Sequence, residues 1–307
     1  MQFAKMHGAG NDFVVVDGHS LDYDWKALSI AMGDRHFGIG SDGLIVALPS
    51  EEGDLRMRMF NPDGSESEMC ANGIRCFAKF AVERGLVSLN NGKFQAETMI
   101  GVLEVHPIMN ANRVVRARVN QGVPILVPED IPVDPSQRLV PIGVGHSTAQ
   151  RNTSTGSEFF NPNNFVFDWP VAIPGHSFSV TGVSMGNPHA VAFIDTPVDE
   201  IALSEYGPLV EHHSLFPNRV NFEVVNVIDR THLTARVWER GAGLTLACGS
   251  GACAIAVASR LHGYTDNDVD IKLPGGTLSI TWDGQGDVFL EGPVEQVFEG
   301  EWPQKLY

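Results

Sequence analysis

The 307-residue chain has few cysteines, few basic side chains and no long apolar run. Its four cysteines are too few for the disulfide framework of a secreted domain. Lysine and arginine total 21 against 37 aspartate and glutamate, which gives a formal net charge of -16. This charge argues against a nucleic-acid partner, because phosphate backbones are bound by basic surfaces. No stretch reaches the roughly 18 consecutive apolar residues of a membrane helix, so no membrane partner is expected either.

The N-terminal segment MQFAKMHGAGNDFVVVDG lacks the unbroken apolar core of a secretory signal. We therefore expect a cytoplasmic protein, in which thiols stay reduced. Hydrophobic residues make up 43% of the chain and charged residues 19%, which is typical of a packed globular protein. A chain of this length has room for two domains of about 150 residues each.

Short runs rich in β-forming residues, separated by Gly, Asn-Pro, Pro-Gly and Asp-Gly turn signals, dominate the chain. Only three segments look helical, and the second and third of them are strongly apolar, as buried helices are. The pattern predicts an α+β fold of two pseudo-symmetric domains, each a mixed or antiparallel sheet wrapped around one central apolar helix. The predicted strands are Phe13–Val16, Leu44–Leu48, Leu55–Phe60, Val102–Val105, Val114–Val119, Ala190–Ile194, Asn221–Val227, Leu233–Glu239, Thr277–Trp282 and Val288–Glu291, and the predicted helices are Trp25–Asp34, Ala71–Arg84 and Gly249–Leu261.

Two pairs of segments resemble each other within the chain. SESEMCANGIRCFAKFAVERGL and RGAGLTLACGSGACAIAVASRLHGY share a cysteine after turn residues and before an apolar helix, and MHGAGNDFVVV resembles SMGNPHAVAFI. Such repetition indicates a duplicated domain, although chance similarity of two Gly-rich units is the alternative. We assign residues 1–121 plus about 292–307 to the N-terminal half and 122–291 to the C-terminal half. Residues 123 to about 180, rich in Pro, Ser, Asn and Gly, are expected to form surface loops and a few short strands.

Cys70 and Cys248 each stand at the start of a predicted apolar helix. A free thiol has a pKa of about 8.5, and a helix N-terminus can lower it to roughly 3.5–7.5, because free N–H groups and the helix dipole favour an anion. Inverting a stereocentre requires one base to remove a proton from one face and an acid to deliver a proton to the other. Two thiols in equivalent positions of similar domains match this requirement, so we predict a cofactor-independent racemase or epimerase.

The cysteines have simpler interpretations as well. Cys76 and Cys253 lie inside the helices and are expected to be core residues, since free cysteine is among the most buried residue types. The C-x5-C and C-x4-C spacings are a weak signal for zinc. A Cys70–Cys248 disulfide in a reducing cytoplasm would be an oxidation artefact.

Six segments of the chain closely resemble the signature segments of the diaminopimelate epimerase family, and they come in the family's order. They are MQFAKMHGAGNDFVVVDG, GIGSDGLI, FNPDGSESEMCANGIRCFAKF, SMGNPHAV, FPNRVNFEVV and VWERGAGLTLACGSGACA. The resemblance covers residues 1 to about 261. It implies an enzyme that needs no pyridoxal phosphate and interconverts LL- and meso-diaminopimelate, in the synthesis of lysine and peptidoglycan precursors. Because the sequence lacks a metal-binding cluster, we expect that no metal is needed either.

The resemblance also implies a role for individual residues. Cys70 and Cys248 would be the acid and base thiols, and His189 and Glu239 would orient the thiols or relay their protons. Backbone N–H groups at the two helix starts would hold the reacting α-carboxylate, where negative charge develops. The expected carboxylate-holding residues are Ala71, Asn72, Gly249 and Ser250, and those expected at the distal end of the substrate are Asn11, Asn61, Asn187, Asn221, Glu239 and Arg240. Each asparagine also stands where a turn or a strand start favours Asn for local reasons.

The sequence departs from the family pattern at three positions. Ala71 stands where glycine is usual and would be strained at a positive φ. Gly43 replaces the glutamine of some members, and Leu244 replaces the usual glutamate. The chain also looks longer than is typical between residues 128 and 183.

Three other functions remain open on the sequence. Proline racemases and hydroxyproline epimerases use the same two-thiol design, although the ERG and FPNRVN segments favour a substrate with a distal amino-acid group. A non-catalytic amino-acid binding protein and a cysteine hydrolase are the alternatives from other classes, and the hydrolase would leave the second thiol unexplained. The strand-rich surface is compatible with a homodimer.

Overall fold

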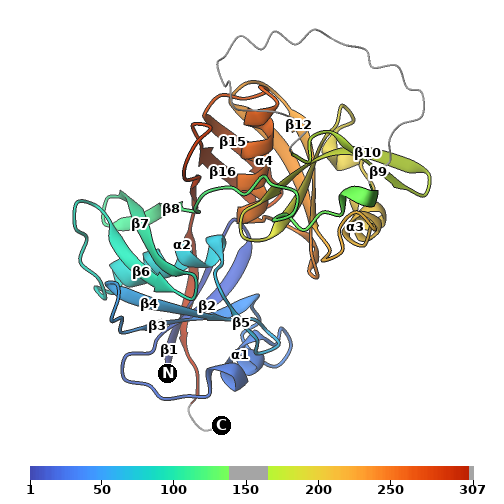
Figure 1. Cartoon of the computed structure of the whole chain (residues 1–307). Helices are drawn as coiled ribbons and strands as arrows, with labels where there is room; N and C mark the ends of the chain where they lie inside the picture. The colour runs from blue at the N-terminus through green and yellow to red at the C-terminus, as the bar shows by residue number, and fades with distance from the viewer. Residues whose placement is uncertain (138–164, 304–307) are drawn as a thin grey trace, which may run out of the picture.

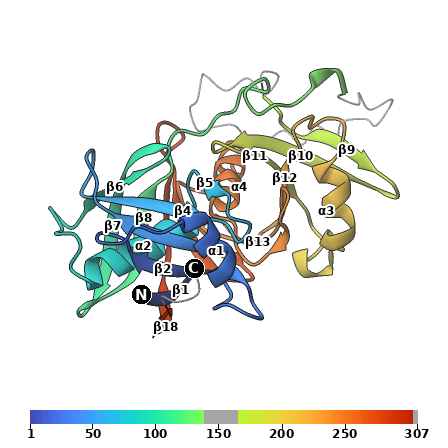
Figure 2. The ribbon, with the colours of Figure 1, turned by 90° about the horizontal axis from the view of Figure 1, so that it is seen from below.

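The computed structural model describes residues 1–137 and 165–303, which form two lobes joined by a narrow waist (Figure 1). Strands greatly outnumber helices, and each lobe wraps a sheet around one apolar helix, α2 in the N-terminal lobe and α4 in the C-terminal lobe. The view from below shows the two lobes side by side (Figure 2). The predicted α+β class with two pseudo-symmetric halves is confirmed.

The N-terminal part of the chain supplies eight strands and two helices in the order β1 (Gln2–Gly8), β2 (Asn11–Asp17), α1 (Trp25–Gly33), β3 (Gly43–Leu48), β4 (Leu55–Phe60), β5 (Glu66–Ser67), α2 (Ala71–Glu83), β6 (Phe94–Thr98), β7 (Gly101–Asn110) and β8 (Arg113–Asn120). After a short 3-10 turn, Pro135–Gln137, the described chain continues with β9 (Trp169–Ile173), β10 (His176–Ser184), β11 (Pro188–Phe193), the 3-10 turn Val198–Glu200, α3 (Leu203–Glu211), β12 (Asn221–Val227), β13 (His232–Glu239), β14 (Gly243–Thr245), α4 (Gly249–Leu261), β15 (Asp268–Leu273), β16 (Gly276–Thr281), β17 (Phe289–Pro293) and β18 (Glu295–Glu301).

The strand pairing of the first lobe is repeated in the second. In the first, β1 pairs antiparallel with β2, β2 parallel with β3, β3 antiparallel with β4, and β4 parallel with β6. In the second, β10, β11, β12, β13 and β15 pair in the same sequence of directions. In each lobe the apolar helix follows the fourth strand and its short partner, β5 or β14. This order is a structural repeat of about 100 residues or more.

Each central helix is buried because its apolar residues recur around most of its circumference. In α2, Ile74 and Phe77 are fully buried, and in α4, Ile255 and Val257 are fully buried. Removing such side chains from water contributes about 1.5–3 kcal/mol each, so each helix is an anchor for the sheet around it. Cys76 and Cys253 are also fully buried, which confirms the prediction that they are core residues.

The chain crosses the waist in two places. After β8 it passes to the second lobe, and after β17, which pairs with β8, it returns so that β18 pairs with β1. Leu290 belongs to the core around α4, whereas Val294 belongs to the core around α2. The division into residues 1–121 plus about 292–307 and 122–291 stays a prediction.

Several elements were not predicted from the sequence. Helix α3 has Pro208 in its interior, and no side chain caps its N-terminus, so Glu205 in its first turn is a weak helix signal. Strands β9 and β10 begin in the segment expected to hold loops and a few short strands. The rest of that segment, residues 138–164, lies outside the described residues. None of the helices in the described part is long and apolar enough to cross a membrane.

Candidate active site

Cys70 and Cys248 are the N-capping residues of α2 and α4. Both have extended backbones, with φ of -140° and -115°, as residues just before a helix do. Each sulfur accepts a hydrogen bond from the N–H three residues on, at 3.4 Å from Gly73 and 3.4 Å from Gly251. The two thiols therefore have the same position and the same backbone donor in their respective lobes.

The starts of α2 and α4 abut each other across the waist. A Cβ atom added to Gly249 would lie 2.4 Å from the Cβ atom of Ala71, so the residues just after the two cysteines are in contact. The Asn72 amide nitrogen donates to the Ala247 carbonyl at 3.2 Å, and this bond is buried. The fold thus brings the two thiol-bearing helix starts to one junction.

Ala71 fits this junction without backbone strain. It is not among the residues with a positive φ, so the strain considered for alanine at this position does not arise. Its methyl group packs against Gly249, which has no Cβ. The first-turn N–H groups of the two helices, at Ala71, Asn72, Gly249 and Ser250, have no partners within their helices and are donors for an anion.

Burial opposes ionisation of both thiols. Burial raises the pKa of Cys70, whereas hydrogen bonds from the Gly73 and Asn72 N–H groups lower it. The pKa of Cys248 is raised well above its ordinary value by burial and then by the charges of Glu239 and Glu223. The sequence predicted that helix starts lower these pKa values; the backbone donors do act in that direction, but the loss of hydration is larger.

Glu239 at the end of β13 lies close to both thiols. Its negative charge raises the pKa of Cys70 and of Cys248. Its Oε1 atom accepts a hydrogen bond from the Thr245 hydroxyl at 2.6 Å. Burial raises the pKa of Glu239 itself, and the Thr245 and Cys248 hydrogen bonds lower it. A carboxyl group in this position can exchange a proton with a neighbouring thiol.

His189 belongs to a buried pair that the sequence did not predict. Its Nδ1 atom lies 2.7 Å from Oε1 of Glu223, and both side chains are fully buried. The Nε2 atom lies 3.0 Å from Oδ1 of Asn187. Oε2 of Glu223 has no hydrogen-bond partner among the residues that the structure describes. The signal for Glu223 in the sequence was a single charged residue inside the apolar strand NFEVVNV.

The predicted asparagines differ in their surroundings. Oδ1 of Asn11 accepts from the Asn72 amide at 3.2 Å and lies 3.7 Å from the Cys70 sulfur. Asn221 is buried, donates to the Pro188 carbonyl at 2.8 Å and accepts from the Arg240 N–H at 2.8 Å. Asn11 is thus tied to the start of α2, and Asn221 is tied to the ERG turn.

Two of the predicted substrate residues have only local contacts. The Asn61 amide donates to the Ser65 hydroxyl at 2.9 Å within a turn after β4. The Arg240 guanidinium is exposed and donates to the Asn218 carbonyl at 3.2 Å. Nothing in these contacts joins Asn61 or the Arg240 side chain to the thiols, so their substrate roles stay predictions.

Gly43 and Leu244 also have structural explanations. The pairing of β2 with β3 and of β11 with β12 makes Gly43 the counterpart of Asn221. A Cβ atom at Gly43 would lie 2.8 Å from the Phe60 carbonyl oxygen, so a larger residue needs a shift of β4. Leu244 is 47% exposed and Leu246 is 54% exposed, so the turn before Cys248 presents apolar side chains.

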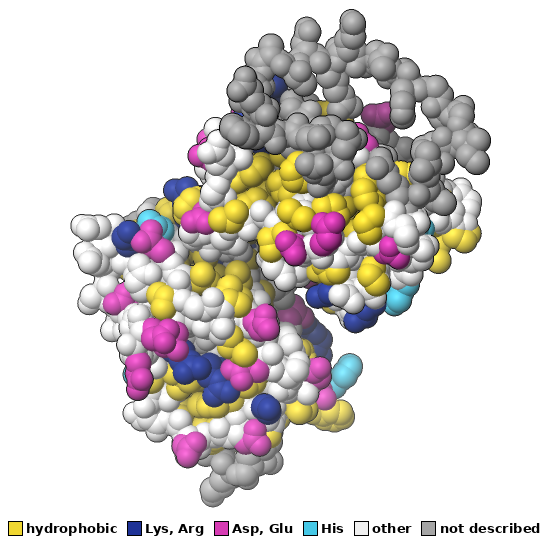
Figure 3. Space-filling view, in the orientation of Figure 1, with side chains coloured by type: hydrophobic (Ala, Val, Ile, Leu, Met, Phe, Trp, Pro, Cys, Tyr) yellow, Lys and Arg dark blue, Asp and Glu magenta, His cyan; other side chains and the backbone are white. Residues whose placement is uncertain are grey.

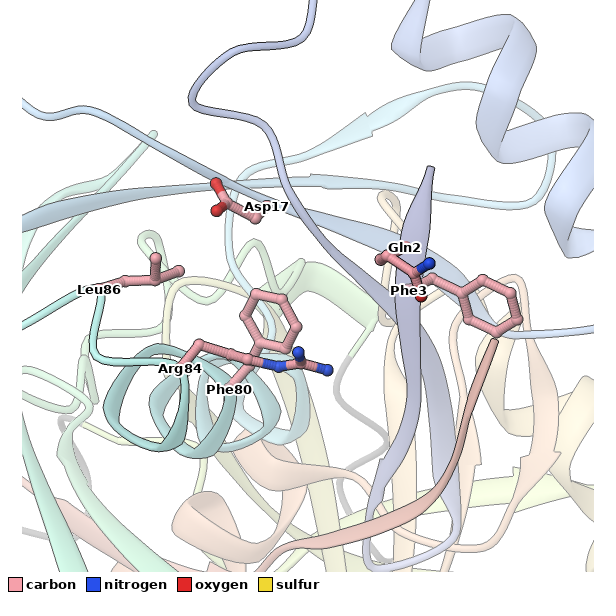
Figure 4. Close-up of a pocket in the computed structure, with 6 residues that line it drawn as sticks. All are labelled: Gln2, Phe3, Asp17, Phe80, Arg84 and Leu86. Carbon is pink, nitrogen blue, oxygen red and sulfur yellow. The ribbon is translucent and has the colours of Figure 1, made fainter. Parts of the chain in front are cut away.

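One surface hollow lies away from this junction. It has a volume of about 210 Å³ and is lined by residues of β1, the end of β2 and the end of α2, among them Phe3, Asp17 and Arg84 (Figure 4). It contains none of the predicted site residues. Acidic side chains are spread over both lobes rather than gathered at one hollow (Figure 3).

The chain is similar to known proteins over its whole length. The family model described as diaminopimelate epimerase matches residues 3–127 and 181–297, which leaves residues 128–180 unmatched. The diaminopimelate epimerase of Acetivibrio thermocellus is 44% identical over 303 residues, covering 98% of both chains. That of Moorella thermoacetica is 44% identical over 306 residues, covering 99% of both.

Solved structures share the fold at much lower identity. A probable proline racemase from Agrobacterium radiobacter has a TM-score of 0.67 at 10% identity, covering 99% of this chain and 93% of its own. A phenazine biosynthesis protein of the PhzF family from Bacillus anthracis has a TM-score of 0.65 at 15% identity, covering 99% of both chains. These likenesses show the two-lobed fold alone.

Proposed function

The chain belongs to the diaminopimelate epimerase family, and on that premise we propose that it converts LL-2,6-diaminopimelate to meso-diaminopimelate with Cys70 and Cys248 as its two acid–base groups. It is an isomerase whose substrate is a small amino acid. The step belongs to the synthesis of lysine and peptidoglycan precursors.

One observation supports the two-thiol mechanism above all others. The residues that follow the two cysteines, Ala71 and Gly249, are in contact, and both sulfurs cap their helices in the same way. A substrate carboxylate at this junction would meet the N-terminal ends of two helices at once. Those N–H donors stabilise negative charge where removal of the α-proton creates it.

The proposed reaction moves one proton on each face of the carbon. One cysteine, as thiolate, takes the α-hydrogen as a proton, and the electron pair of the C–H bond stays on the substrate, delocalised into its carboxylate. The other cysteine, as thiol, delivers its proton to the opposite face. The thiolate and thiol have then exchanged roles, and proton exchange with solvent resets them.

The remaining predicted residues have supporting roles in this proposal. Glu239 and His189 orient the thiols or relay their protons. The asparagines at positions 11, 61, 187 and 221, together with Glu239 and Arg240, hold the distal end of the substrate. Arg240 suits a carboxylate because its planar guanidinium can donate two parallel hydrogen bonds. No pyridoxal phosphate or metal takes part in this scheme.

Deuterium exchange tests the substrate and the mechanism together. Purified protein is incubated in D2O with LL-diaminopimelate, and with proline and lysine as controls, and the α-hydrogen is followed by NMR. We expect exchange and epimerisation of diaminopimelate alone, without added pyridoxal phosphate or metal. Exchange of proline instead would favour the proline racemase type, and exchange of none of the three would contradict the proposal.

The setting of the enzyme is also a proposal. A cytoplasmic location stays a prediction from the sequence. A homodimer, and the absence of a nucleic-acid partner, stay predictions from the strand-rich surface and the acidic charge.

A further inference from the structure

The two lobes repeat each other's strands but not each other's charges. By strand register, Phe13 and Ile45 of β2 and β3 correspond to His189 and Glu223 of β11 and β12. The contacts agree: a Cβ atom at Gly73 would lie 3.2 Å from Ile45, and one at Gly251 would lie 2.9 Å from Oε1 of Glu223. A buried acid–base pair beside α4 thus stands where two apolar side chains stand beside α2.

In the strands the buried charged residues lie beside α4, whereas in the helices the buried charged residue belongs to α2. Five residues after each capping cysteine, α2 has Arg75 and α4 has Cys253, and both residues are fully buried. A buried guanidinium therefore lies behind the start of α2, and a neutral thiol lies behind the start of α4. This position adds to the charge difference that His189 and Glu223 create between the two lobes.

Arg75 has no counter-charge among the described residues. Its guanidinium donates to the Ala71 carbonyl at 2.8 Å, to Oδ1 of Asn72 at 2.8 Å and to the Pro293 carbonyl at 3.2 Å, all neutral oxygens. It forms no ion pair in the part of the chain that the structure describes. Burial lowers its pKa to about 10, so it remains a cation at neutral pH. A buried charge without an opposite charge is costly, and a function is the usual reason that it is kept.

The groups near Arg75 that can become negative are Cys70 and Cys76 of its own helix and Cys253 of α4. Burial raises the pKa of Cys76 to about 12 and raises that of Cys253 as well, so both residues stay thiols at neutral pH. Burial also raises the pKa of Cys70, but this side chain is only half-buried and accepts the Gly73 N–H. The charge of Glu239 on β13 raises the Cys70 pKa further, and the charge of Arg75 lowers it. Cys70 is therefore the one of these three thiols that can ionise most readily beside Arg75.

Cys248 faces carboxyl groups instead of a cation. Glu239 of β13 and Glu223 of β12 both raise its pKa. The Glu223 oxygen that contacts His189 of β11 is the end of this pair that lies against α4. The pair therefore presents a carboxyl oxygen to the start of α4.

We propose that Arg75 is a positioning residue that makes Cys70 the thiol that ionises first in the free enzyme and leaves Cys248 as the thiol that keeps its proton. This inference rests on the two-thiol function proposed above. In the first turnover, Cys70 takes the α-proton and Cys248 donates its own. The stereoisomer whose α-hydrogen faces Cys70 therefore binds the predominant singly ionised form of the free enzyme.

Alkylation of the two cysteines as a function of pH tests the proposal. The wild-type protein is treated with limiting iodoacetamide from pH 5 to pH 11, and the modified cysteine is identified by peptide mass spectrometry. The midpoint of each pH curve is compared, rather than the rate, because Cys70 is also the more exposed residue. We expect the Cys70 midpoint to lie at least about one pH unit below that of Cys248. Equal midpoints, or a lower one for Cys248, would overturn the proposal.

Arginine variants test the cause. Arg75→Gln removes the charge and is expected to raise the Cys70 midpoint by about one pH unit or more, whereas Arg75→Lys keeps a cation and is expected to raise it less. Arg84→Gln is the matched control, because it removes a charge from the exposed end of the same helix, where Arg84 pairs with Glu299. An unchanged Cys70 midpoint in Arg75→Gln refutes the role of Arg75. If Arg75→Gln does not fold, the Cys70 midpoint of Arg75→Lys and the difference between the Cys70 and Cys248 midpoints of the wild-type protein still test the proposal.

The same samples separate this inference from the proposed function. The alkylation needs no substrate, so it is run beside the deuterium-exchange assay on one preparation. Active protein whose thiols share one midpoint would contradict the charge asymmetry and leave the epimerase proposal standing. Inactive protein with well-separated midpoints would contradict the epimerase proposal instead.

Discussion

The contact between Ala71 and Gly249 makes a test at the scale of single residues. In Gly249→Ala, the new methyl group would lie 2.4 Å from the Cβ atom of Ala71, so the two helix starts must separate. We expect this variant to lose about 1–3 kcal/mol of unfolding free energy and most of its activity. The double variant Ala71→Gly/Gly249→Ala removes the clash and should recover stability, as measured by chemical denaturation. A stable, fully active Gly249→Ala would show that the helix starts do not abut.

The two capping thiols should be indispensable, and the buried thiols should not. Cys70→Ala and Cys248→Ala are each expected to reduce epimerisation at least about 10³-fold, because a two-base reaction lacks its acid or its base. Cys253→Ala is the matched control: it removes a thiol from α4 inside the core, five residues from Cys248. Circular dichroism establishes that each variant is folded. Full activity in either capping variant would rule out the two-thiol mechanism.

We expect the buried Glu239 carboxyl group to lower the free energy of unfolding at neutral pH, where it is ionised. Burial raises its pKa above the ordinary value of 4.5, so the folded state holds the proton more tightly than the unfolded chain. Its contribution to stability is therefore most favourable below pH 4.5 and is lost as the pH rises through the folded-state pKa. We expect Glu239→Gln, which keeps an oxygen for the Thr245 hydroxyl, to melt at a higher temperature than wild type at pH 8 and to show less advantage at pH 4.5.

That variant should also lose activity, because an amide cannot exchange protons with a thiol. The measurement is a pair of thermal melts at the two pH values beside the epimerisation rate. A melting-temperature difference that is the same at both pH values would show that the Glu239 carboxyl group titrates normally.

Site residues could be predicted from the sequence when the residues next to them in the chain carried the signal. Cys70 and Cys248 were identifiable because turn residues precede them and an apolar helix follows within a few positions. Glu223 was not, since its partner His189 is 34 residues away and the strand register joins them. Arg75 was not identified from the sequence, because its burial depends on the packing of Gly8 and Gly292 against its guanidinium.

At the scale of elements, the capping of α1 offers a test of local stability. Oδ1 of Asp24 accepts hydrogen bonds from the N–H groups of Lys26 and Ala27, both at 3.1 Å. Asp24→Ala is expected to lower the unfolding free energy by about 1 kcal/mol, as the loss of an N-cap does. Epimerisation should be unchanged, because no contact joins α1 to the two thiols. Asp22→Ala, a neighbouring exposed carboxylate before the helix, is the control and should have a smaller effect.

The predicted elements were accurate where a turn signal bounded an apolar run. Strands Leu55–Phe60 and Asn221–Val227 and helix Gly249–Leu261 have the predicted bounds. Strand β18 was missed because nearly all its residues are exposed, so it lacks the alternation of a half-buried strand. Helix α3 was missed because Gly207 and Pro208 in its middle are typical of turns. Contacts with segments far away in the sequence determine β18 and α3, and such contacts cannot be recognised from a local sequence pattern.

At the scale of the whole molecule, the two lobes should unfold together. Strand β17 pairs with β8 and strand β18 pairs with β1, so each lobe contains hydrogen bonds that depend on the crossing chain. We expect one thermal transition, with coincident curves from far-UV circular dichroism and from tryptophan fluorescence, since Trp25 reports on one lobe and Trp238 and Trp282 on the other. Two resolved transitions would show that the lobes are independent folding units.

The pairing of the last strand with the first has a consequence for synthesis in the cell. During translation β1 (Gln2–Gly8) emerges long before its partner β18 (Glu295–Glu301). Until β18 has emerged, β1 has one open edge, and an open edge can pair with another nascent chain. The second lobe can assemble its sheet from contiguous sequence in the meantime. The N-terminal lobe is therefore the part of this protein that is exposed longest to wrong strand pairing during its synthesis.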